Sequence, residues 1–207
     1  MSITRERFDN GETFETYRER ILAGGGLTKD LLVASETGLA ATEIDISAFA
    51  ALPARLRVLV LHFDACSDSA DTLPILNRIE QETGKIEMRI IERDDNPDLR
   101  DSHLLRGKFA AVPVVIFLDD NFNEIGHFIE RPDSITKLRA ERKQAIYDSN
   151  PAYGTIDAPP SEVPDEIRAA ILADIMAMRE EVRPLLISET VRELSEIFAP
   201  IAQQAGR

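Results

Sequence analysis

Residues 56–70 read LRVLVLHFDACSDSA and contain the transition on which the fold depends. Residues 56–63 are a nearly unbroken run of β-branched and other apolar side chains, which is typical of a strand buried on both faces. Residues 71–83 follow with apolar side chains at helical spacing. The single cysteine, Cys66, is therefore expected where a buried strand turns into a helix.

Outside this stretch, three further runs have the pattern of strands: residues 86–92, 112–118 and 124–129. Helices are expected over residues 71–83, after Asn96-Pro97 and over residues 132–147. A right-handed crossover makes the first two strands parallel, and the short Asp-Asn turn makes the last two antiparallel. The sequence thus predicts an α/β fold with a mixed four-stranded sheet in the order β-α-β-α-β-β-α.

We divide the chain into four parts: helices over residues 1–53, the α/β domain over 54–149, a linker over 150–163 and a helical tail over 164–207. The last of the N-terminal helices is expected over residues 42–52. The tail has an apolar stripe at helical spacing, made by Ile167, Ile171, Ile175 and Met178. Such a stripe must be covered by the chain's own domain or by another subunit. We expect Pro184 to kink or interrupt the tail helix and Pro200 to end it.

The composition is strongly acidic. Among 207 residues, 24 Lys and Arg stand against 37 Asp and Glu, which gives a formal net charge of -13. Nucleic acids and anionic membranes attract basic surfaces, so we expect neither as a partner. No run of apolar residues is long enough to span a bilayer, and the charged start lacks the apolar segment of a signal peptide. We therefore expect a cytoplasmic protein.

Metal and cofactor chemistry is not indicated by residue spacing. A single cysteine excludes an intrachain disulfide and an all-cysteine zinc site. The histidines, His62, His103 and His127, are scattered, and their spacing predicts no metal site. No glycine-rich phosphate or dinucleotide motif follows a strand. We therefore assign no metal and no cofactor, and we interpret His62 as a residue on a strand face.

Cys66 is the residue with the clearest chemical potential. At a helix N-terminus, free backbone N–H groups and the helix dipole favour a thiolate over a thiol. The neighbouring carboxylates of Asp64 and Asp68 oppose that effect by like-charge repulsion. The sequence leaves the net direction of the pKa shift open.

The surroundings of Cys66 resemble the thioredoxin fold. Pro74 follows the cysteine by eight residues, and the segment AVPV at residues 111–114 leads into a strand. The resemblance implies that Pro74 lies inside the helix and that the Val112–Pro113 bond is cis and close to Cys66. A proline at the head of an otherwise apolar strand independently indicates a strand start or bend.

Further motifs resemble one subgroup, the bacterial "thioredoxin family protein" group with a helical N-terminal extension. They are RERFDNGETFETYRERI at residues 5–21, the turn Cys66-Ser67-Asp68, the tract RIIERD at residues 89–94, and Gly126 followed by Glu130-Arg131-Pro132. Each motif is short, but their order and spacing are consistent. The resemblance covers residues 4–145.

One departure from thioredoxin limits the chemistry. A dithiol reductase needs a second thiol to attack the mixed disulfide and release the partner. Ser69 occupies that position, and its hydroxyl stays protonated at neutral pH. We therefore exclude dithiol reductase activity. Cys66 can still form a mixed disulfide or be oxidised to a sulfenate.

The first functional hypothesis is a monothiol redox or thiol-sensing protein. Cys66 is its reacting group, and Ser67 and Ser69 are expected to hydrogen-bond the sulfur. The residues expected to bind a protein or small-thiol partner are Ser67, Asp68, Val112 and Pro113, with strand addition as the mode of binding. Glu130 and Arg131 are further candidates for lining this groove. The hypothesis predicts that Cys66 reacts faster with a thiol reagent than a free cysteine does.

Two alternatives remain open. In the first, the protein is a redox-inactive module. It either binds a partner protein at the same groove or forms a homodimer through its C-terminal helices. In the second, it is an enzyme like glutathione transferase, in which a thioredoxin fold also precedes C-terminal helices. The chain order opposes this second alternative. About fifty-five residues precede the first strand, and the 57 residues after position 150 are too few for the usual helical substrate domain.

Overall fold

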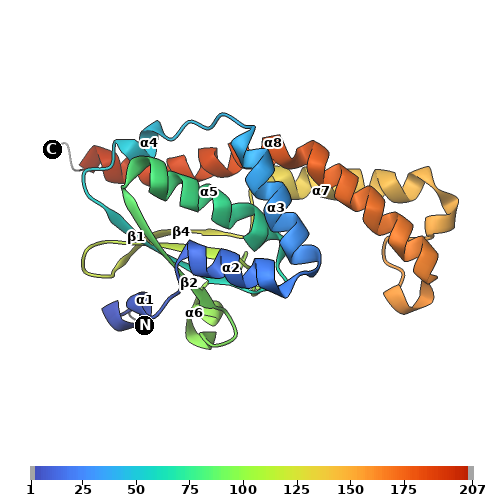
Figure 1. The fold of residues 1–207 in the computed structure, drawn as a ribbon, viewed down its shortest axis with the longest axis horizontal. Helices are drawn as coiled ribbons and strands as arrows, with labels where there is room; N and C mark the ends of the chain where they lie inside the picture. Colours follow the sequence, from blue (N-terminus) through green and yellow to red (C-terminus); the bar gives the residue numbers. More distant parts are fainter. Residues whose placement is uncertain (1–2, 205–207) are drawn as a thin grey trace.

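A four-stranded mixed sheet forms the centre of the protein (Figure 1). The structure is a computed structural model that describes residues 3–204. Strand β1 (Leu56–His62) lies between β2 (Ile86–Glu92), which is parallel to it, and β3 (Val114–Leu118), which is antiparallel. Strand β4 (Glu124–Ile129) pairs antiparallel with β3 at the edge, so the order is β2-β1-β3-β4. The predicted α/β class and strand directions are confirmed.

Helices cover both faces of the sheet and extend the chain at each end. They are α1 (Arg5–Asp9), α2 (Phe14–Gly24), α3 (Gly26–Ala40), α4 (Ser47–Ala50), α5 (Ser67–Thr83), α6 (Pro97–Ser102), α7 (Asp133–Ser149) and α8 (Asp165–Gln204). Short 3-10 turns at Pro151–Tyr153 and Pro160–Glu162 connect α7 to α8. The Thr13 hydroxyl accepts a hydrogen bond from the backbone N–H of Thr16 and caps α2.

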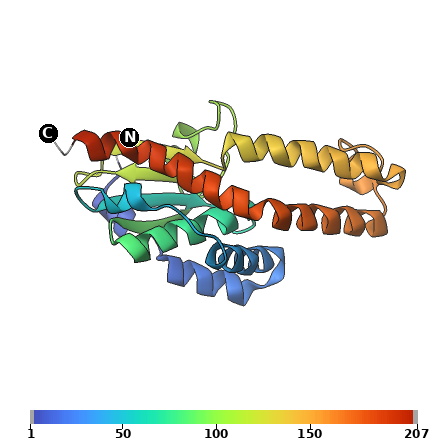
Figure 2. The same ribbon diagram turned by 90° about the horizontal axis from the view of Figure 1, so that it is seen from above.

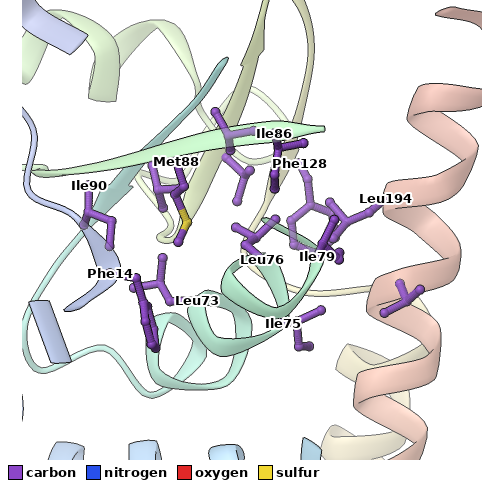
Figure 3. Close-up of a cluster of buried hydrophobic side chains, with 14 of the residues drawn as sticks. Phe14, Leu73, Ile75, Leu76, Ile79, Ile86, Met88, Ile90, Phe128 and Leu194 are labelled. Atoms are coloured by element: carbon purple, nitrogen blue, oxygen red, sulfur yellow. The ribbon is translucent and has the colours of Figure 1, made fainter. Parts of the chain in front are cut away.

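The alternation of side chains along β1 creates two separate cores. Val58 and Val60 point into the larger core, with α2, α3, α5 and α8, while Leu59 and Leu61 point into a smaller one with α1 and α6. Figure 3 shows the larger core where α5 faces β2, through Leu73, Leu76, Ile79, Ile86, Met88 and Ile90. Burial on both faces explains why the β1 sequence is an unbroken apolar run.

The C-terminal helix packs back on the chain's own domain. Its last third lies against the sheet, where Phe198 contacts Phe49 and Phe117 with ring centroids 5.0 and 4.5 Å apart. Its first part pairs with α7 in a long hairpin that projects from the sheet (Figures 1 and 2). In this hairpin Met178 packs against Ile135. Although α8 has 40 residues, neither it nor any other described helix is long and apolar enough to cross a membrane.

The expected ends of several elements were wrong. Helix α8 continues through Pro200, where we expected it to end. At Pro184, where we expected a kink or an interruption, the helix is not interrupted, and its axis bends along its middle part (Figures 1 and 2). The helix expected over residues 42–52 is reduced to α4, since Ile44 and Ile46 pack against the core from outside a helix. The helix expected from residue 71 begins at Ser67, so Cys66 itself caps it.

We predict that Phe198→Ala destabilises the whole domain, because it removes the aromatic contacts that join α8 to the sheet. Large-to-small changes of a fully buried Phe cost about 3–5 kcal/mol, and Phe198 is 0% exposed. Urea unfolding followed by circular dichroism measures the loss. Leu185→Ala is the matched control on the same helix, because Leu185 is 47% exposed. Equal stability of the two variants would show that α8 does not hold the domain together.

Candidate functional site

Cys66 lies at the N-terminus of α5, where the chain leaves β1 and turns into the helix. It is the N-cap residue, and its Sγ accepts a hydrogen bond from the backbone N–H of Ser69 at 3.4 Å. The thiol donates to the backbone oxygen of Val112 at 3.3 Å. The side chain is half-buried. The predicted position of Cys66 at the junction of strand and helix is confirmed.

The second part of the site is the segment that leads into β3. The Val112–Pro113 peptide bond is cis, as the resemblance implied. The Pro113 carbonyl accepts a hydrogen bond from the Glu130 N–H at 2.8 Å, so Glu130 does lie beside this segment. Among the hydrogen bonds of residues 3–204, the backbone N–H of Val112 has no acceptor. A backbone N–H without an acceptor is available to an incoming carbonyl.

Burial raises the pKa of the Cys66 thiol above its ordinary value, because a thiolate is poorly hydrated here. Hydrogen bonding from Ser69 lowers the pKa, and the negative charge of Asp68 raises it again. The net direction is upward, so the helix N-terminus does not produce a thiolate at rest. This upward direction opposes a fast-reacting cysteine, and the reactivity of Cys66 itself stays a prediction.

The two serines of the turn differ in their contacts. The Ser69 side chain is fully buried, and its Oγ has no hydrogen-bond partner among the described residues. Ser69 hydrogen-bonds the Cys66 sulfur through its backbone N–H. The Ser67 carbonyl accepts a hydrogen bond from Arg179 of α8 at 3.4 Å. The turn around Cys66 is thus held by backbone groups and by the C-terminal helix.

Asp68 points away from solvent, into a cluster of arginines. Its carboxylate binds Arg131 and, at 2.9 Å, Arg139 of α7. Asp68 is 7% exposed. The carboxylate expected to bind a partner is therefore engaged within the chain, and Arg131, on the segment after β4, lies close enough for its charge to interact with Cys66.

Asp71, one turn further along α5, is the most heavily bonded carboxylate of this cluster. It accepts from Arg139 at 3.0 Å, from Arg179 at 2.6 Å, from Arg183 at 2.8 Å and from the Ser35 hydroxyl at 2.7 Å. These donors come from α7, α8 and α3. Asp71 is only 3% exposed, so the contacts are made in a medium where an unpaired charge is very costly.

A glycine makes room for this arrangement. A Cβ atom placed on Gly38 of α3 would lie 2.3 Å from Cδ of Arg183. Arg183 is held at its far end by both Asp71 and Ser35. The arginine therefore crosses α3 only because position 38 lacks a side chain.

His62 belongs to a different environment. Its ring is 1% exposed and packs edge-on against Tyr17, with 5.2 Å between ring centroids. Burial lowers the pKa of His62 to about 4, so the ring is neutral at pH 7. The recorded hydrogen bonds of Cys66 go to Ser69 and Val112, so His62 does not form a thiol–imidazole pair with it.

Comparison with known proteins identifies the family. A family model described as Thioredoxin matches residues 28–144, more than half of the chain. The chain belongs to the thioredoxin family.

Two solved structures resemble the protein along nearly its whole length. An HIV epitope scaffold is 22% identical, with 94% of this chain and 96% of that chain covered and a TM-score of 0.59. A protein of unknown function from Pseudomonas aeruginosa is also 22% identical, with 97% and 99% covered and a TM-score of 0.59. At this identity both show the fold alone. A comparison with curated proteins gave no match.

Within this thioredoxin-family chain, sequence reasoning located the cysteine and the cis proline but missed the arginine cluster. The available signal was the spacing of Asp68 and Asp71, which are three residues apart where the helix after Cys66 begins. Nothing in the sequence paired these carboxylates with Arg139, Arg179 or Arg183, which lie 68 to 112 positions away.

We predict that Asp71→Asn strongly destabilises the protein, because it removes the carboxylate shared by three arginines, of which Arg139 and Arg183 are buried. Breaking a buried ion pair by removing one partner costs about 3–5 kcal/mol. Urea unfolding measures the change. Asp120→Asn is the control, since Asp120 pairs with Arg57 but has a side chain that is 75% exposed. Similar stability for the two variants would contradict a central role for Asp71.

We predict that Cys66 in the folded protein reacts more slowly with iodoacetamide at neutral pH than Cys66 in the same chain unfolded in urea. Each unit of pKa change alters the thiolate fraction about tenfold, and burial also limits access. Rates followed by intact-protein mass across a pH series should give a higher midpoint for the folded chain. A folded-state rate equal to or faster than the unfolded one would contradict the raised pKa.

Proposed function

We propose that this protein is a monothiol thiol–disulfide exchange protein that acts through Cys66. The observation that carries the proposal is that the half-buried Cys66 thiol hydrogen-bonds the Val112 carbonyl, while the backbone N–H of Val112 has no acceptor among the described residues. A partner chain that places a carbonyl oxygen on this N–H lies directly beside Sγ. Main-chain hydrogen bonds of this kind hold extended peptides without demanding a particular sequence.

The reaction is a simple exchange. The Cys66 thiol loses its proton to solvent, and the thiolate attacks one sulfur of a disulfide in the partner. A new bond forms between Sγ and that sulfur, the partner's S–S bond breaks, and the other partner sulfur leaves as a thiolate. The partner's disulfide is the oxidant. The Ser69 hydroxyl does not attack the product, so the mixed disulfide persists until an external thiol reduces it.

The raised pKa of Cys66 defines the conditions for this chemistry. The thiolate fraction at neutral pH is small, so a disulfide that only collides with the protein reacts slowly. A docked partner stays longer and reacts more. This favours a bound protein substrate at neutral pH, whereas a small freely diffusing disulfide needs a higher pH to react.

The second candidate is a binding module in which Cys66 takes no part. The same raised pKa favours it, because a protonated, half-buried thiol is also what an inert cysteine looks like. In that case the groove at Val112, or a dimer formed through the C-terminal helices, provides the function. Covalent capture at Cys66 distinguishes the two candidates.

We predict that incubation with glutathione disulfide at mildly alkaline pH adds one glutathione to Cys66, as measured by intact-protein mass. The adduct should persist in the natural chain and be absent from Cys66→Ser. Ser69→Cys should release the adduct and leave an intramolecular disulfide, because the new thiol lies one helical turn from Sγ. Ser67→Cys is the matched control, since that position directly follows Cys66 and is poorly placed to bridge to it.

The outcomes separate the candidates. An adduct that persists in the natural chain and is lost through Ser69→Cys supports monothiol exchange. Absence of any adduct in the folded natural chain, together with full reaction of the unfolded chain, would overturn it in favour of the binding module.

A further inference from the structure

Two histidines and a glutamate that are scattered in the sequence meet at one end of the sheet. His103 follows α6, while Glu124 and His127 belong to β4. The Glu124 carboxylate lies 3.0 Å from Nε2 of His103 and 2.6 Å from Nδ1 of His127. One ligand atom from each residue lies within 4.8 Å of the others.

A β-bulge explains why the sequence did not reveal this cluster. Residues three apart in a regular strand point to opposite faces, which separates Glu124 from His127. In the structure Phe117 pairs with Gly126 but Leu118 pairs with Glu124, so Ile125 is the extra residue of a bulge. A bulge re-aims the side chains around it. Here it brings Glu124 and His127 to the same side of β4.

The hydrogen bonds of His103 indicate which of its ring nitrogens is free to bind a metal ion. Its Nδ1 lies 2.8 Å from the backbone oxygen of Leu99, which can only accept a hydrogen bond. The proton of the neutral ring is therefore on Nδ1, and Nε2 presents a lone pair to Glu124. Nε2 and the Glu124 carboxylate are then two acceptors 3.0 Å apart, and a cation bound between them would satisfy both.

This use of the second nitrogen is the arrangement found in metal-binding histidines. A ligating imidazole usually donates its other N–H to a carbonyl or carboxylate, which fixes the ring and its tautomer. His103 is also 7% exposed, so its ring is held in place before any ligand arrives. Glu124 and His127 are more exposed, with side-chain exposures of 35% and 45%, and have room to adjust.

The donor set and the space around it fit a small divalent cation. Imidazole nitrogen and carboxylate oxygen bind Zn²⁺ at about 2.0–2.2 Å, so tetrahedral ligand atoms lie roughly 3.3 Å apart. The two Glu124 oxygens lie 3.0 Å from His103 and 2.6 Å from His127. Rotation of the more exposed Glu124 and His127 side chains would bring one carboxylate oxygen and both nitrogens to this spacing. The three residues also line a cavity of about 390 Å³, together with Ser102 and Asn123, which leaves a fourth position open to water.

We propose that His103, Glu124 and His127 form a binding site for one Zn²⁺ ion. The ligands are Nε2 of His103, Nδ1 of His127 and one carboxylate oxygen of Glu124, and a water molecule completes the tetrahedron. The site is separate from Cys66: Glu124 pairs with Leu118 at one end of β3, while the cis proline precedes the other end. The proposal therefore does not depend on the function proposed for the thiol.

A second group of possible ligands serves as the control. His62, Asp64 and Glu92 also bring ligand atoms within 4.8 Å of one another. Arg20 already occupies that site, because its guanidinium binds Asp64 and lies 3.5 Å from Nε2 of His62. A cation there would have to displace a resident positive charge, so we expect no Zn²⁺ binding by this second group.

The test is a calorimetric titration of the full chain, with any affinity tag removed, using ZnCl₂ as the probe. We expect one Zn²⁺ per chain and a higher melting temperature with the metal than without it. His127→Gln and Glu124→Gln should each weaken binding at least tenfold, since even changes behind the ligands cost about 10–100-fold. Cys66→Ser and His62→Gln should bind Zn²⁺ as the natural chain does.

His127 is half exposed, so its replacement leaves the fold intact and keeps the test decisive even if His103→Gln fails to fold. Cobalt(II) provides a second readout, because its visible spectrum distinguishes tetrahedral nitrogen and oxygen ligands from thiolate. Absence of zinc binding, or unchanged binding by His127→Gln and Glu124→Gln, would overturn the proposal. So would loss of binding in Cys66→Ser or His62→Gln, because that result places the metal elsewhere.

Discussion

The buried carboxylate of Asp71 is the contact on which the arrangement of the helices depends. Arginines from α7 and α8 and a serine from α3 all meet at this side chain of α5. Burying any one of these charged or polar groups without a partner costs free energy, and they can be buried here because each is hydrogen-bonded to Asp71. The set therefore specifies one relative placement of four helices. Apolar packing by itself would tolerate several.

The same contacts hold the turn that contains the cysteine. Asp68 and Asp71 lie in the first turns of α5, directly after Cys66, and Arg179 reaches from α8 to the Ser67 carbonyl. The sulfur is thus positioned by helices that lie far from it in the sequence. The turn is therefore not positioned by its own backbone alone. The C-terminal helix contacts it directly, through Arg179 and the Ser67 carbonyl.

Local patterns predicted most of the sheet because its strands are buried in regular ways. The unbroken apolar run of β1 and the alternation in β2 are properties of neighbouring residues, and the position of Cys66 follows from them. The cis bond at Pro113 was implied by the resemblance to thioredoxin-fold proteins. The direction of the Cys66 pKa shift was not predictable, because it depends on how deeply packing buries the sulfur.

Long-range pairing was invisible for a different reason. Asp71 binds Arg183, which lies 112 positions away in the chain. No local pattern in a single sequence indicates that two such distant residues are in contact. No metal site was predicted at His103 and His127 because the histidines are scattered in the sequence, and the bulge at Ile125 is what brings His127 beside Glu124. An irregularity of one residue thus changed which side chains meet.

The lack of a side chain at Gly38 should constrain how this position varies among homologues. Arg183 passes within the volume that any β-carbon at position 38 would occupy. Relatives in which a short residue replaces this arginine have space for alanine or serine at 38, whereas relatives that retain it do not. The two positions should therefore covary across homologues, although 145 positions separate them in the chain.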